Sequence, residues 1–153
     1  MSTAGAAGQA RLPVYFVQGE QLAAVTRAGA TPLDAVRQLV AGPTRAERGR
    51  GFRTYVPAGT RVRSVTVADG IATVDLTAPF ATDMNPDRML ARLAQLVRTL
   101  TGLDGTTRVL LLVNGASTAG MFPGIPTGEP ITLRFLETPN VPVPTPRKEK
   151  LPP

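Results

Sequence analysis

The sequence predicts an α+β domain, a mixed β-sheet with two helices packed on one of its faces. Strand-like and helix-like segments follow one another in the order ββαββαββ between residues 12 and 138. The chain has 153 residues, of which 42% are hydrophobic, and this is enough to bury one core. We expect the small, polar residues 1–11 to be a flexible lead-in and the proline-rich residues 139–153 to be an extended linker.

The predicted domain opens with two strands, residues 13–18 and 22–28, in which β-branched and aromatic side chains are frequent. A helix follows. Thr31 suits its N-cap and Pro32 its first turn. Gly42 ends the helix, because glycine readily adopts the left-handed conformation found there.

A hairpin comes next, with its turn at Asp69-Gly70, a dipeptide typical of two-residue β-turns. The apolar residues of its second strand share one face: Ala72, Val74 and Leu76. Asp75 falls on the opposite face. We expect that face to be exposed, because the alternation indicates a sheet covered on one side only.

The longest helix is expected between Asn85, its N-cap, and Gly102. Its apolar stripe consists of Met89, Leu93, Leu96, Val97 and Leu100. The residues expected on its solvent side are Arg88, Arg92 and Gln95. An almost wholly apolar strand at 108–115 should be central in the sheet, and the last strand is expected at 131–137.

The glycine- and proline-rich loop at residues 115–130 is long enough to suggest a role. It carries three apolar side chains, Met121, Phe122 and Ile125, of which Phe122 and Ile125 are the candidates for a contact. Two interpretations stay open: these side chains pack back onto the core, or they form a contact surface for a partner. Both residues are therefore candidate binding residues.

The residue inventory argues against an enzyme. The chain has no cysteine and no histidine, which excludes thiolate nucleophiles, imidazole bases and metal sites built from these residues. Both lysines, Lys148 and Lys150, lie in the tail. Nothing in the sequence brings together the aspartates that would form a carboxylate site: Asp69, Asp75, Asp83 and Asp87. We predict no catalytic residues and no cofactor.

The segment DMNPD at residues 83–87 resembles the opening of a calcium-binding loop. Such a loop requires glycine at its sixth position and glutamate at its twelfth, where this chain has Arg88 and Ala94. Asn85 followed by Pro86 explains the segment as a helix start. We therefore predict no metal site.

The net charge of +6 arises mostly from arginine. An aromatic content of 5% without tryptophan argues against a base-stacking surface, so we predict no nucleic-acid partner. Four arginines cluster between the first helix and the hairpin: Arg45, Arg48, Arg50 and Arg53. Guanidinium groups suit carboxylate and phosphate partners, which makes this cluster a candidate contact patch. The alternative is that these are solvated side chains on a polar loop.

Several motifs occur in the order found in a known family: GPT at 42–44, PAGT at 57–60, VDL at 74–76 and AQLVRTLT at 94–101. On these motifs, residues 14–137 resemble the GerMN domain, a sporulation and germination module also found in bacterial envelope lipoproteins. The resemblance implies an α+β fold akin to ring-building motifs. It offers no catalytic residues to carry over.

The resemblance also implies a function, that of a non-catalytic extracytoplasmic module acting through protein assembly. Its partners would be other envelope proteins or a second copy of the chain. The alternative is a module that binds an anionic envelope polymer or small ligand through the arginine cluster. The chain shows no signal peptide and no lipobox cysteine. We therefore expect it to be membrane-tethered only through a segment absent from this chain.

Overall fold

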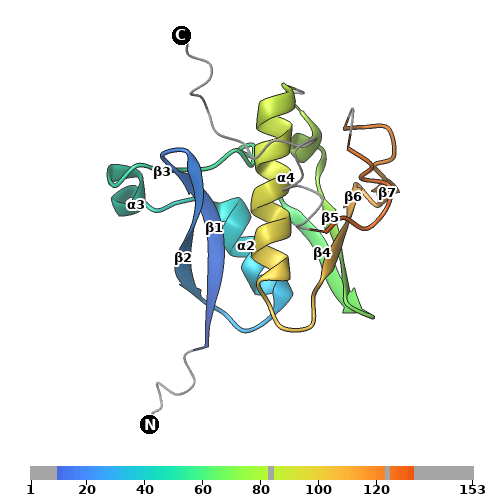
Figure 1. Cartoon of the computed structure of the whole chain (residues 1–153), viewed down its shortest axis with the longest axis horizontal. Coiled ribbons are helices and arrows are strands. Elements are labelled where there is room, and N and C mark those ends of the chain that lie inside the picture. The colour runs from blue at the N-terminus through green and yellow to red at the C-terminus, as the bar shows by residue number, and fades with distance from the viewer. Residues whose placement is uncertain (1–9, 83–84, 123–124, 133–153) are drawn as a thin grey trace.

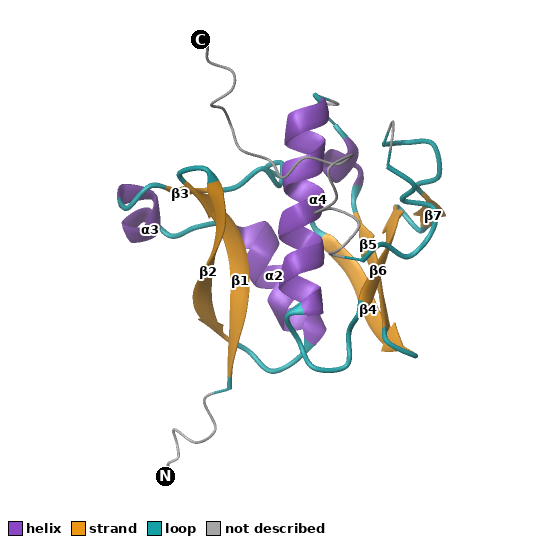
Figure 2. Ribbon diagram, viewed as in Figure 1, coloured by secondary structure: helices purple, strands orange, loops and turns teal. Residues whose placement is uncertain are grey.

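The computed structural model describes residues 10–82, 85–122 and 125–132 (Figures 1 and 2). It confirms the predicted α+β class. The strands form two separate sheets, however, where one mixed sheet was expected. The two longer helices lie between these sheets (Figure 2). Among the described residues, no helix is both long and apolar enough to cross a membrane.

The first sheet has the strand order β2-β1-β3 and consists of β1 (Arg11–Gln18), β2 (Gln21–Ala28) and β3 (Phe52–Arg53). β1 and β2 form an antiparallel hairpin in which Gln18 lies opposite Gln21. β3 pairs only with the last two residues of β1. Along most of the second edge of β1, therefore, no strand of the described residues lies beside it.

Both predicted helices form, and both begin where expected. Helix α2 (Pro32–Ala41) starts after the N-cap Thr31 and ends before Gly42, whose φ of 84° requires the freedom of glycine. Helix α4 (Pro86–Thr101) starts after Asn85, whose side chain accepts backbone N–H groups of the first turn. The helix-cap interpretation of this segment is confirmed.

The surroundings of α4 differ from the prediction. Arg92 and Gln95 were expected in solvent, but they are 1% and 0% exposed. The reason is that α4 contacts the first sheet through β1 and also contacts the second sheet. A helix covered on two sides buries positions that a single-sided amphipathic pattern assigns to water.

The second sheet has the order β4-β5-β6-β7. Its strands are β4 (Val62–Ala68), β5 (Ile71–Leu76), β6 (Arg108–Val113) and β7 (Ala116–Ser117). β5 pairs antiparallel with β4 and parallel with β6, so this sheet is mixed, as predicted. α2 packs against β4 and α4 against β6, which covers one face.

The ends of the predicted domain are only partly described. β1 begins at Arg11, the last residue of the predicted lead-in. Ile131 forms an isolated antiparallel bridge with Val109 of β6, where the last strand was expected to start. Residues 133–137 of that predicted strand lie outside the described residues, as do 1–9 and the predicted linker.

Candidate interaction surfaces

The predicted arginine loop contains a short helix, α3 (Arg45–Gly49), that was not predicted. Thr44 and Glu47 form its capping box. Thr44 Oγ1 accepts the Glu47 N–H at 3.1 Å, and Glu47 Oε1 accepts the Thr44 N–H at 2.9 Å. The signal was present in the sequence, because a threonine followed three residues later by glutamate is typical of a helix start.

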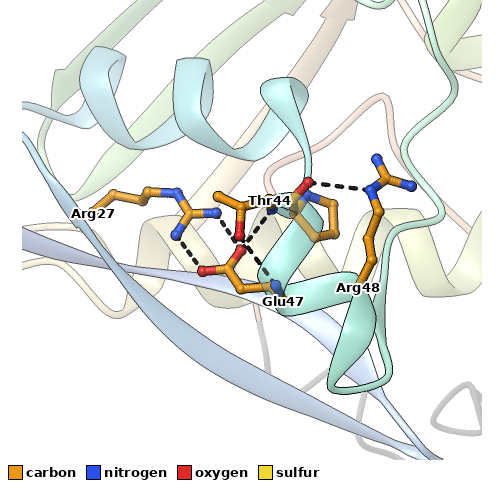
Figure 3. A network of polar contacts seen from close by, with 5 residues as sticks. Arg27, Thr44, Glu47 and Arg48 are labelled. Atoms are coloured by element: carbon orange, nitrogen blue, oxygen red, sulfur yellow. Dashed lines mark hydrogen bonds and ion pairs between the residues drawn. The ribbon is translucent and has the colours of Figure 1, made fainter.

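Glu47 also forms a bidentate ion pair with Arg27 of β2 (Figure 3). Arg27 Nη1 lies 2.7 Å from Oε2, and Nη2 lies 2.6 Å from Oε1. The two side chains are 13% and 10% exposed. The Arg27 hydrogen bonds, helped by the Thr44 N–H, lower the pKa of Glu47 to about 2. The same pairing raises the pKa of Arg27. This ion pair fastens α3 to the first sheet.

The predicted patch arginines are all exposed and lie in or just after α3: Arg45, Arg48, Arg50 and Arg53. Arg48 Nε donates to the carbonyl of Pro43 at 3.3 Å, on the side of α3 away from Glu47 (Figure 3). Arg53 Nη2 donates to the carbonyl of Gly19 at 3.2 Å. All four arginines are thus exposed on or near α3, and two of them also donate to backbone carbonyls.

The two apolar candidates of the long loop lie in different environments. Phe122 is 1% exposed, and its ring centroid lies 6.3 Å from that of Phe80. Ile125 is half-buried and packs against the same core. Phe122 therefore offers no side-chain surface to a partner, whereas part of Ile125 remains accessible.

The aspartates considered for a carboxylate site are separated in the fold. Asp69 occupies the hairpin turn with a φ of 54°, Asp75 lies within β5, and Asp87 is in the first turn of α4. Asp83 lies outside the described residues. In the part of the chain that the structure describes, no group of three or more metal-ligating side chains could hold a metal ion.

Asp75 was predicted to face solvent, and this prediction is wrong, since the residue is 7% exposed. Its Oδ1 accepts the N–H of Gly115 at 2.8 Å. Its Oδ2 accepts from Arg63 Nε at 3.1 Å. The aspartate of the VDL motif therefore ties β5 to the bulged end of β4 and to the turn after β6.

Side chains of α4 form hydrogen bonds with the backbone of β1 at the edge of this strand that faces away from β2. Thr99 Oγ1 accepts the Tyr15 N–H at 3.0 Å, and Gln95 Nε2 donates to the Tyr15 carbonyl at 3.2 Å. Gln95 Oε1 also accepts the N–H of Tyr55 at 2.7 Å. These two helical side chains make the hydrogen bonds that a neighbouring strand would make.

Arg92 has a comparable role at the start of α4. Its Nη1 donates to the carbonyls of Phe80 at 2.8 Å and Thr82 at 2.5 Å. These contacts hold the 3₁₀ helix η1 (Ala78–Ala81) against α4. The arginine predicted to be solvated is a buried anchor of the loop that follows β5.

A family model described as Germane, sporulation and spore germination, matches residues 13–119, which include most of β1 and both longer helices. The chain belongs to the Germane family. Within this Germane domain, the family-like motifs GPT and VDL contain the α3 cap and the aspartate of β5. No curated protein matches the chain.

Solved structures share the fold of this Germane domain. The first GerMN domain of the sporulation protein GerM from Bacillus subtilis has a TM-score of 0.62 and 20% identity, covering 80% of this chain and 98% of that chain. The tandem GerMN domains of the same protein give 0.63 and 20%, covering 82% and 46%. A chain described as "Putative Lipoprotein" from Clostridium perfringens gives 0.60 and 17%, covering 83% and 89%.

Proposed function

We propose that this Germane domain is a non-catalytic interaction and assembly module that works outside the cytoplasmic membrane. The family is one of sporulation and spore germination. Its structural neighbours include a sporulation protein and a chain described as a lipoprotein, which supports an envelope-associated role. The domain would reach its place through a membrane tether on the full-length protein.

The observation that carries the proposal is the use of the buried polar side chains. Among them, the hydroxyls of Thr60 and Thr106 have no hydrogen-bond partner within the described residues. Five others join two elements of the fold: Glu47, Asp75, Arg92, Gln95 and Thr99. A catalytic site keeps such groups pointed at substrate, whereas here they satisfy backbone or one another. The surface that remains for function consists of strand edges and arginines, which suit contact with another macromolecule.

Site-specific photocrosslinking in the source bacterium tests this proposal. A photoreactive residue would be placed at one exposed position on each outer element: Thr26 on β2, Arg45 on α3 and Thr66 on β4. An assembly module gives discrete adducts of fixed mass from at least one of these positions. The proposal is overturned if none gives an adduct while Asp87→Asn abolishes the phenotype of the native gene.

A second candidate function rests on the arginine patch. Within the described residues, none of its four members forms an ion pair with a carboxylate, so their charges are available to an anion. Binding of an anionic envelope polymer would be salt-sensitive and lost when all four are changed to Gln. Titration at two salt concentrations checks this, with Arg61→Gln and Arg108→Gln as the exposed controls. No binding at low salt would exclude it.

A further inference from the structure

One strand edge of the domain is long and open. β4 is the terminal strand of the second sheet and, within residues 10–82, 85–122 and 125–132, pairs only with β5. Ala68 and Ile71 flank the two-residue turn and lie opposite each other, so they form a hydrogen-bonded pair. Hydrogen-bonded and non-hydrogen-bonded pairs alternate along an antiparallel pair of strands. The N–H and C=O groups of Val65 and Val67 therefore point away from β5. Among the residues that the structure describes, no group accepts from or donates to this outer edge.

The edge lacks most of the features that protect terminal strands from pairing. The segment of β4 from Ser64 to Ala68 has no proline, glycine or charge, and it keeps a regular register with β5. A bulge lies at one end only, between Val62 and Ser64. The single charge of the strand, Arg63, is already paired with Asp75. This segment can therefore accept another strand without burying an unpaired charge.

The side chains of β4 also favour an added strand. Val67 is 39% exposed and is the one exposed large hydrophobic residue among those described. It lies on the same face as Val65, which packs against the core. The other long edge, that of β2, contains three alanines, which have low β-propensity. The valines and threonine of β4 are the better template for pairing.

We propose that this edge accepts β4 of a second copy of the domain, in an antiparallel pair related by a twofold axis. The inference rests on the proposed assembly function and names its surface and its partner. With Val65 opposite Val67 of the second copy, the outward backbone groups of both strands meet and each exposed Val67 gains a valine neighbour.

Charge complementarity favours the second copy as the occupant. In this register the bulged end of one strand, which carries Arg63, lies beside the turn of the other copy, which carries Asp69, and the twofold axis repeats this approach of opposite charges. Asp69 is exposed, and its carboxylate has no ion pair or hydrogen bond with any described residue. The outward groups also allow registers with Val65 or Val67 opposite itself, and in the first of these Asp69 approaches Arg61 of the other copy. Charge therefore favours a second copy as the occupant without selecting one register.

The pairing surface is small. A single added strand buries less than the roughly 1,200–2,000 Å² of stable complexes. We therefore expect weak association, with a dissociation constant on the order of 10 μM to 1 mM. A shared membrane tether would raise the local concentration and so promote the pairing.

Sedimentation velocity of the full chain, from about 1 μM to about 1 mM, tests this inference. The wild type should shift reversibly from monomer to dimer, whereas Val67→Lys should stay monomeric with an unchanged unfolding midpoint. Asp69→Asn keeps the turn, because Asn-Gly is equally favoured there, and should weaken the dimer about threefold at low salt. The matched control Asp104→Asn, at an exposed turn residue, should not.

A monomer at every concentration, or dimerisation of Val67→Lys with wild-type affinity, overturns the inference. Photocrosslinking from Thr66 to a protein other than this chain also overturns it, because the edge would then serve another partner. Either result leaves the assembly function standing if discrete adducts form in the cell. The absence of adducts at all tested positions contradicts the assembly function itself.

Discussion

The second edge of β1 and the outer edge of β4 both present backbone N–H and C=O groups, but in the described part of the chain side chains of the fold satisfy such groups only at β1. Over most of its length, each is a strand edge whose backbone groups have no neighbouring strand among the residues that the structure describes. At β1, Gln95 and Thr99 of α4 reach across and satisfy Tyr15. At β4, no described group does so. The fold closes the edge that lies inside the molecule and leaves open the one that faces out.

The difference follows from where water can reach. Gln95 is fully buried, so an unmade hydrogen bond at Tyr15 would carry its full desolvation penalty. Water satisfies the edge of β4 at little cost, and a partner strand can replace that water. An open edge therefore costs little folding free energy and stays available for assembly. The hydrogen bonds at a closed edge contribute to the stability of the fold.

The largest effect is expected from breaking the closed edge with Gln95→Leu. This change removes the partners of the Tyr15 carbonyl and the Tyr55 N–H, and each unsatisfied buried group costs about 1–3 kcal/mol. We expect the free energy of unfolding to fall by roughly 2–5 kcal/mol in urea titration. Gln38→Leu, at a half-buried site on α2, is the control and should change it by less than about 0.5 kcal/mol. Equal losses in both variants would contradict the closure.

A smaller effect is expected at the first sheet, where Glu47→Gln replaces the bidentate pair with Arg27. We expect a loss of roughly 1–3 kcal/mol, because hydrogen bonds between charged groups are the strong ones. Urea titration of the variant beside Glu129→Gln, an exposed glutamate, measures it. A loss no larger than that of the control would show that the pair contributes nothing.

The same ion pair predicts a pH dependence. Folding lowers the Glu47 pKa from 4.5 to about 2, so its contribution is complete above pH 4.5 and is lost as the pH falls toward 2. Unfolding titrations between these values should show the wild type losing more stability than Glu47→Gln. Parallel pH profiles would contradict a lowered pKa in the folded state.

Asp75→Asn should have an intermediate to small effect. The amide can still accept the Gly115 N–H, but it loses the charge that pairs with Arg63, whose side chain is 51% exposed. Screening by water limits the loss to about 1 kcal/mol. Thermal unfolding at low and high salt should show the difference shrinking as salt rises. A salt-independent loss would indicate that the charge is not the cause.

The smallest effect on stability is expected at the open edge. Val67→Lys places a charge where the side chain is already 39% exposed, so the free energy of unfolding in dilute solution should change by less than about 0.5 kcal/mol. Urea titration at low micromolar protein measures it. A loss similar to that of Gln95→Leu would show that Val67 is part of the core and that the two edges do not differ.

Much of this fold was predictable from local patterns. The caps at Thr31 and Asn85 and the Asp69-Gly70 turn formed as expected, because each depends on a few neighbouring residues. The missed helix α3 also carried a local signal, the capping box of Thr44 and Glu47. These features need no knowledge of the tertiary structure.

The division into two sheets and the burial of polar side chains were not predictable in the same way. Arg92 and Gln95 follow the helical pattern of solvent positions, but the loop after β5 covers Arg92 and the segments of Tyr15 and Tyr55 cover Gln95. Asp75 alternates as an exposed residue, and the turn at Gly115, 40 residues later, provides its partner. Contacts between distant segments decide all of these positions. For the arginine patch, the sequence located the cluster and the structure adds that all four side chains are exposed.

Amide hydrogen exchange compares the two edges most directly, because it reports each N–H separately. In dilute solution the amides of Tyr15 and Tyr55 should exchange slowly and those of Val65 and Val67 quickly. At millimolar protein the two valine amides should become protected while the tyrosine amides stay the same. Valine amides as slow as the tyrosine amides in dilute solution, or indifferent to concentration, would contradict an open edge that a second copy fills.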